Sequence, residues 1–251
     1  MSAAEGTYDA LVVPINQFDL EKMAFKHSGD QGGVPVIKAR YERTIVSLNL
    51  APTQKEWLDV AFSLDYDSES FQGTKRDNFW SCPFTLELDS QLAERLDKIE
   101  KKAAEATEAA VGKLKEPKPF VWRFGVTHHA PNWASRLKTA VHLRGNNLTK
   151  FHVIKGTEVT SVEGEAVIEL ADANNRFQGS KALAVVTLQK VWAKNTDKDP
   201  LYKDTTIIKA GINWVVEEIV IKVATPKKRK WTSVFNPIAM AAATVSDDEA
   251  D

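Results

Sequence analysis

Basic and aromatic side chains are interleaved over the second half of the chain, and together these residue types can bind nucleic acid. Residues 117–231 carry 19 Lys or Arg against 10 Asp or Glu, and five of the seven tryptophans. Proteins that hold single strands combine a cationic groove for the phosphates with rings on which bases stack, at roughly 1–3 kcal/mol per base. The pattern therefore predicts a surface that binds single-stranded nucleic acid.

The rings of this region have two interpretations, because a large aromatic side chain packs into a core as readily as it stacks on a base. Phe120, Trp122 and Phe124 alternate along one predicted strand, so most of them are expected in the core. Trp133 and Phe177 lie in polar segments and are the better candidates for exposed stacking rings. The predicted contact residues are Trp122, Arg123, Trp133, Arg136, Lys138, Arg144, Lys150, Lys155, Arg176, Phe177, Lys181, Lys227, Lys228, Arg229, Lys230 and Trp231.

The densest positive charge is the run PKKRK at residues 226–230. It can clamp phosphates, since each Lys or Arg releases counterions on binding, or it can serve as a nuclear import signal. A solvated turn is the third interpretation. We expect an intracellular protein, in a host nucleus or at a viral replication site if the run is an import signal, and otherwise in the cytoplasm.

An acidic tail follows, because the last 20 residues contain four acids and no Lys or Arg. Such a segment, residues 232–251, is expected to be flexible. Its charge suits competition with nucleic acid for a basic groove, or the binding of a basic partner such as a replication protein. The acids are Asp247, Asp248, Glu249 and Asp251.

Motifs of the common enzyme classes are absent from the chain, including GxxxxGK[ST], GxGxxG, GxSxG and HExxH. His128 and His129 are adjacent, so on a strand they point to opposite faces; a metal site that also uses His142 and His152 is the minority interpretation. Cys82 is the only cysteine, which excludes an internal disulfide. We expect no catalysis, no cofactor and no metal, and no apolar run approaches the roughly 20 residues of a membrane span.

One long amphipathic helix is predicted over residues 89–115. Apolar residues recur at spacings of three and four from Leu88 to Leu114, in a run rich in Ala, Glu and Lys. Asp89 and Ser90 can cap its start, and Pro117 stops it.

Alternating patterns predict strands on both sides of this helix, which makes a mainly β, α+β domain over residues 34–231. Residues 1–33 are expected to form a poorly defined N-terminal arm that ends in a Gly-rich turn. The predicted strands cover residues 34–50, 79–88, 120–127, 139–143, 156–170, 181–193 and 207–223.

The order of these parts resembles the single-stranded DNA-binding proteins of podophages and their counterparts in large eukaryotic DNA viruses. The resemblance rests on residues 84–88 running into the helix, on 122–124, on 156–159, on 181–191 and on the acidic end. It implies an OB-fold-like antiparallel barrel with one long helix between strands. It also implies protection of single-stranded DNA during replication, recombination or repair, without nucleotide hydrolysis. The PKKRK run and residues 1–78 have no obvious counterpart in that family, whose tail is longer and more acidic.

Two other interpretations remain open. Stacking and phosphate contacts serve RNA as well as DNA, since only contacts to the 2′-OH distinguish them. A β-rich virion or scaffold protein, with a basic surface that neutralises packaged nucleic acid, also fits the composition. A DNA-binding protein and a virion or scaffold protein could each form a homo-oligomer.

Overall fold

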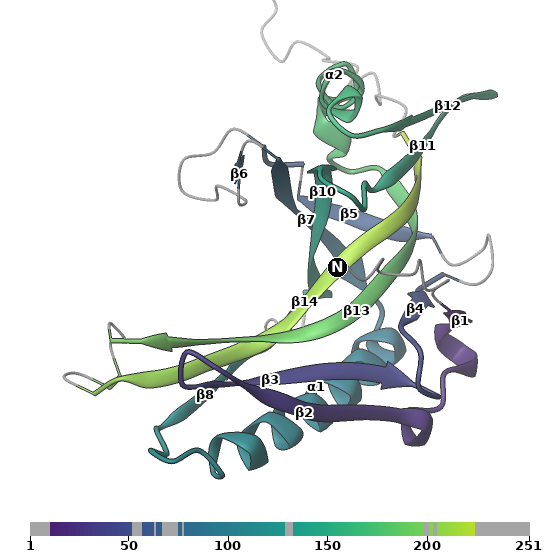
Figure 1. The fold of residues 1–251 in the computed structure, drawn as a ribbon. Coiled ribbons are helices and arrows are strands. Elements are labelled where there is room, and N and C mark those ends of the chain that lie inside the picture. The colour runs from purple at the N-terminus through teal and green to yellow at the C-terminus, as the bar shows by residue number, and fades with distance from the viewer. Residues whose placement is uncertain are drawn as a thin grey trace, which may run out of the picture.

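One long helix is inserted into a chain of strands (Figure 1). The computed structural model describes residues 11–51, 57–62, 64–66, 75–76, 78–128, 133–197, 201–202 and 205–223. The elements in chain order, with η for a 3-10 helix, are β1 (Leu11–Pro14), η1 (Ile15–Gln17), η2 (Leu20–Lys22), β2 (Met23–Gln31), β3 (Val34–Tyr41), β4 (Val46–Asn49), β5 (Leu58–Phe62), β6 (Lys75–Arg76), β7 (Phe79–Leu88), α1 (Ser90–Val111), β8 (Phe120–Arg123), β9 (Val126–Thr127), β10 (Ser135–Arg144), β11 (Lys150–Lys155), β12 (Glu158–Glu163), α2 (Ala166–Asp172), η4 (Asn175–Phe177), β13 (Lys181–Thr196) and β14 (Ile207–Lys222).

Five strands close into a ring. β13 pairs with β5, β5 with β7, β7 with β10, β10 with β14, and β14 with β13. Phe84, Leu137 and Trp214 are fully buried in the core. The predicted OB-like, mainly β fold is confirmed, except that the contact between β10 and β14 is parallel.

The helix α1 forms where its periodicity predicts it. The Asp89 carboxylate accepts a hydrogen bond from the Leu92 backbone N–H at 2.8 Å, which caps the first turn. The helix ends at Val111, earlier than predicted, because Gly112 is a poor helix former. In the described part of the chain, no helix is both long and apolar enough to cross a bilayer.

The described residues of the predicted N-terminal arm form two paired strands and two short 3-10 helices, so the expectation of a poorly defined segment is wrong for residues 11–31. β1 pairs in parallel with β4, and β2 pairs with β3, which in turn pairs with β13. These partners are distant in sequence, and a local pattern does not reveal them.

The strands β13 and β14 are each 16 residues long and run well beyond the barrel (Figure 1). β2 and β3 join this stretch through β13, and β8 joins it through β14. We call the resulting sheet, made of β2, β3, β8, residues 190–196 and residues 207–213, the extension sheet. Its inner face, which includes the buried Ile37 and Ile212, contributes to the hydrophobic core, and α1 lies along the same sheet. The opposite side is its outer face.

Residues 156–170 do not form the single strand predicted for them. β12 ends at Glu163, and Gly164, with φ of +64°, starts a turn into α2. Val167 and Ala171, four residues apart, are fully buried, so the apolar residues of this segment satisfy a helical spacing as well as an alternating one. The glutamates suit a solvated helix face equally well.

Candidate nucleic-acid interface

Lysines from neighbouring strands lie in register across the extension sheet. Lys26 on β2 is the partner of Lys38 on β3, and Lys38 is the partner of Lys190 on β13. Lys194 on β13 lies opposite Lys209 on β14. Because direct partners in a sheet share a face with Cβ atoms about 5 Å apart, strand pairing places Lys26 beside Lys38, and Lys194 beside Lys209, on the outer face.

A tryptophan ring lies among these lysines. Trp192 is the register partner of Gly211, and a methyl group on Gly211 would come within 3.0 Å of Trp192 Cζ2. The ring therefore covers the glycine on the outer face, and Trp192 is only partly buried. Its neighbour Ala193 points the other way and packs against the core.

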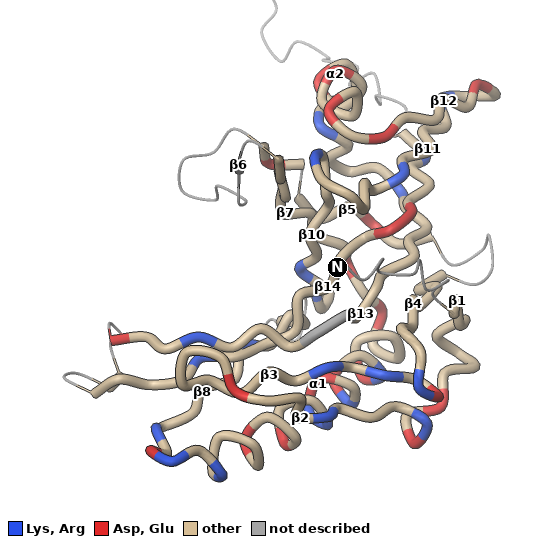
Figure 2. Tube along the Cα trace, in the orientation of Figure 1, with Lys and Arg blue, Asp and Glu red and all other residues tan. Residues whose placement is uncertain are grey.

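Acidic residues are scarce around this tryptophan. β3, β8 and β13 contain no Asp or Glu, and neither does β14 before Glu217. In β2 the one acid, Asp30, pairs with His27 Nε2 at 2.7 Å. Within the described residues, Lys26, Lys38 and Lys194 make no ion pair. Figure 2 shows basic residues along β3, β13 and β14 of the extension sheet.

The basic face continues from the extension sheet onto the barrel. Arg123 at the end of β8 is the partner of Gly211 and is exposed. Two residues later, the Gly125 carbonyl accepts a hydrogen bond from the backbone N–H of Lys138 on β10 at 3.0 Å. β8 and β10 pair with β14 at residues 208–211 and 214–216, so Arg123 and the exposed Lys138 lie where the extension sheet meets the barrel.

A buried carboxylate on α1 holds the segment around Gly125, where the extension sheet meets the barrel. Glu100 on α1 accepts hydrogen bonds from the Gly125 N–H, at 2.9 and 3.0 Å, and from Trp214 Nε1–H at 2.7 Å. Burial raises the pKa of Glu100 to about 7, although these hydrogen bonds favour the charged form. A side chain at position 125 would collide with Glu100 and Trp214, each 2.8 Å from its Cβ, so the contact requires glycine.

An aromatic cluster lies beyond Lys138. The Arg136 guanidinium lies 4.8 Å from the centre of the Phe62 ring and 5.6 Å from that of Trp133. Both rings are more than half exposed, and Arg136 Nη2 lies 3.6 Å from Glu87 Oε1. The exposure predicted for Trp133 is confirmed, and Phe62 was not predicted.

Other predicted basic contacts lie away from this face, beside acids. Arg144 pairs with Glu165 at 2.6 Å, and Lys181 pairs with Asp59 at 2.6 Å. Arg176 lies over the Tyr66 ring at 4.5 Å and near Asp172 at 3.5 Å. Lys150 and Lys155 are exposed on β11, whose neighbour β12 places glutamates opposite both of them.

Two predicted stacking rings face the core instead. Phe177 is fully buried and stacks on Phe151, with ring centres 6.0 Å apart, so its predicted exposure is wrong. The polar residues around it form the turn, while the ring itself fills the core. Trp122 packs against the core on the opposite face of β8 from Arg123. A nucleic-acid strand bound to the outer face therefore cannot contact both residues.

The remaining predicted contacts lie outside the described residues. They are Lys227, Lys228, Arg229, Lys230 and Trp231, with the tail acids Asp247, Asp248, Glu249 and Asp251.

The described histidines contact other side chains and do not contact one another. His128 contacts Asp97 at 2.6 Å and Ser135 at 2.9 Å, while His152 contacts Ser161 at 2.8 Å. Burial lowers the pKa of His142. Among the described residues no cluster of His, Cys, Asp and Glu could hold a metal ion.

Sequence reasoning missed the residues that the N-terminal strands bring to the outer face. Lys26 and Lys38 lie outside the basic half of the chain, and only pairing with β13 places them beside Trp192. The alternation of Lys38 with the buried Ile37 and Ala39 was a signal that this lysine faces solvent.

No protein-family model matches the chain, and no curated protein does either. Among solved structures, it aligns with two forms of the single-stranded DNA-binding protein of bacteriophage Enc34. The first is 9% identical, with 87% of this chain and 99% of that one covered and a TM-score of 0.36. Its C-terminal truncation is 8% identical, with 82% and 97% covered and a TM-score of 0.38.

A third aligned structure is gp2.5, a single-stranded DNA-binding protein of bacteriophage T7. It is 12% identical, with 78% of this chain and 94% of that one covered, at a TM-score of 0.35. At TM-scores below 0.5, these alignments do not establish a function for this chain.

Proposed function

We propose that this protein binds single-stranded DNA across the outer face of the extension sheet, without catalysis and with little dependence on sequence. The observation that carries the proposal is the partly exposed Trp192 ring lying on Gly211 among lysines in register. Its role would be to hold single strands during DNA replication, recombination or repair.

The face supplies both kinds of contact that a single strand needs. Five strands about 4.8 Å apart span roughly 19 Å from β2 to β8, which is enough for several nucleotides to cross. The lysine and arginine side chains attract phosphates, and the Trp192 ring offers a surface to one base.

The partly exposed Trp192 ring favours a single strand over a duplex. In a duplex each base is covered on both faces by its neighbours, so only an unstacked base can lie against Trp192. The basic side chains alone would attract either form of nucleic acid.

A salt titration tests the proposal. We expect labelled oligo-dT to bind in fluorescence anisotropy, with log K falling against log salt at a slope of about −4 if Lys26, Lys38, Arg123, Lys138, Lys194 and Lys209 all contact phosphates, at about 0.7 per contact. Absence of binding at low salt would refute the proposal. Competition with oligo-rU then tells whether RNA is bound equally well.

The tryptophan has its own test. Trp192→Ala is expected to weaken oligo-dT binding about tenfold, since stacking contributes roughly 1–3 kcal/mol per base. Phe124→Ala is the matched control. Phe124 is 46% exposed, but it lies one residue past Arg123, and successive residues along a strand point to opposite faces, so its ring is expected to point away from the outer face. Equal losses in the two variants would remove Trp192 from the interface.

A further inference from the structure

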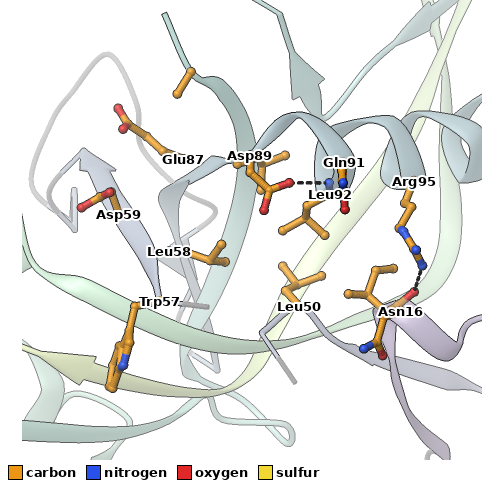
Figure 3. Close-up of a pocket in the computed structure, with 13 residues that line it drawn as sticks. Asn16, Leu50, Trp57, Leu58, Asp59, Glu87, Asp89, Gln91, Leu92 and Arg95 are labelled. Carbon is orange, nitrogen blue, oxygen red and sulfur yellow. Dashed lines mark hydrogen bonds between the residues drawn. The ribbon is translucent and has the colours of Figure 1, made fainter. Parts of the chain in front are cut away.

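A cavity of about 460 Å³ lies near the start of α1, and Figure 3 shows the residues that line it. It lies between η1, the start of β5, the end of β7 and the first turns of α1. Leu50, Leu58 and Leu92 give it an apolar floor, and the partly buried Trp57 stands at its edge. An apolar floor with an aromatic wall suits a flat, ring-shaped ligand.

The polar lining is mainly acidic. Asp59, Glu87 and Asp89 contribute three carboxylates, against one guanidinium from Arg95. All four charged groups already have a partner. Arg95 Nη1 donates to the Ile15 carbonyl at 2.9 Å, Asp59 pairs with Lys181, Glu87 lies 3.6 Å from Arg136, and Asp89 accepts from the Leu92 N–H. The carboxylates keep lone pairs that can accept hydrogen bonds from further N–H donors.

Two side-chain amides complete the lining. Asn16 and Gln91 are exposed, and within the described part of the chain neither makes a side-chain hydrogen bond. An amide can donate and accept at once, which allows paired hydrogen bonds to a base such as adenine.

The cavity adjoins the Phe62, Arg136 and Trp133 cluster. Ala134, which lines it, follows Trp133 in the chain, and Glu87, which also lines it, contacts Arg136 at 3.6 Å. A strand held at the cluster therefore has its bases within reach of the cavity.

We propose that the cavity holds one unstacked nucleobase that carries an exocyclic amino group, adenine or cytosine, from a strand bound to the outer face. This inference rests on the proposed function. The amino group of either base donates to carboxylate or amide oxygens, whereas thymine presents a carbonyl oxygen at that position and is repelled by carboxylates. The phosphates remain outside, near Arg136 and Lys138.

Base preference tests the proposal in the full chain. Oligo-dC and oligo-dA are expected to bind about fivefold more tightly than oligo-dT of equal length, the lower end of what one good base contact provides. An oligonucleotide of N4,N4-dimethylcytosine, which keeps the ring but lacks amino donors, is expected to lose the advantage of oligo-dC.

A double variant ties the preference to the cavity. Asn16→Ala with Gln91→Ala is expected to bring the ratio of dC to dT affinities close to one. The matched control is Gln178→Ala, which removes an exposed amide outside the cavity and is expected to keep the preference.

The outcomes separate the two proposals. Failure of every oligonucleotide to bind would overturn the proposed function and this inference with it. Binding of oligo-dT together with equal affinity for oligo-dC and oligo-dA would overturn the cavity alone. A preference that survives the double variant would also overturn it, because the amino group would then be recognised elsewhere.

Discussion

Gly211 shows how one residue shapes the proposed interface. A methyl group there would lie 2.6 Å from the Arg123 carbonyl oxygen and 3.0 Å from Trp192 Cζ2. Both contacts are too close, so the absence of a side chain lets the Trp192 ring lie against Gly211 and lets β8 approach β14.

Gly211→Ala is therefore expected to lower the free energy of unfolding by about 1–3 kcal/mol, as overpacking does, and to weaken oligo-dT binding by displacing Trp192. Urea unfolding and anisotropy measure the two effects. Gly112→Ala is the control, because Gly112 has an ordinary helical φ of −63° and its nearest neighbour is 3.7 Å away. Wild-type affinity in Gly211→Ala would contradict the account of Trp192.

Phe177 illustrates a ring whose role is stability. It is fully buried against Phe151, so Phe177→Ala is expected to lower the free energy of unfolding by about 3–5 kcal/mol. The folded fraction should bind oligo-dT with unchanged affinity. A loss of affinity at full folding, judged by circular dichroism, would return Phe177 to the interface.

At the scale of elements, Glu100 connects α1 to the junction between β8 and β10. The carboxyl group is buried, and its pKa is raised to about 7 from an ordinary value of 4.5. Between these pH values the folded protein keeps a proton that the unfolded chain has released, so stability falls as the pH rises from 4.5 to 7. The full loss is on the order of 3 kcal/mol.

Glu100→Gln is expected to remove this decline. Urea unfolding of both proteins between pH 5.5 and 8 measures it, and the difference between them isolates Glu100 from the histidines, because the lowered pKa of His142 gives the opposite slope. Identical pH profiles would show that Glu100 does not titrate in this range.

The elements with a strong internal period were predictable from sequence. α1, β7, β13 and β14 follow their apolar spacing closely, because the burial of one face decides both the element and its pattern. The segment after Gly164 was not predictable from sequence. Its apolar residues fit both a strand and a helix, and tertiary packing decided between them.

At the scale of the molecule, the fold sorts basic residues that composition treats alike. Lys38 comes to lie beside Lys190 through a pairing of strands some 150 residues apart, which no local pattern contains. By contrast Arg144 and Arg176, both predicted contacts, meet acids at the other end of the barrel. The sequence therefore indicated a basic surface with aromatic rings, and the long-range strand pairing determines which residues lie on it.

The most direct test compares two pairs of charge reversals on the same sheet. Lys38→Glu with Lys194→Glu changes the outer face of the extension sheet, and Lys150→Glu with Lys155→Glu makes the same change in charge on β11. The first pair is expected to weaken oligo-dT binding more than about tenfold at low salt and to reduce the magnitude of the salt slope by about 1.4, whereas the second leaves the slope unchanged. Equal losses from both pairs, or a loss from the second pair alone, would contradict the account.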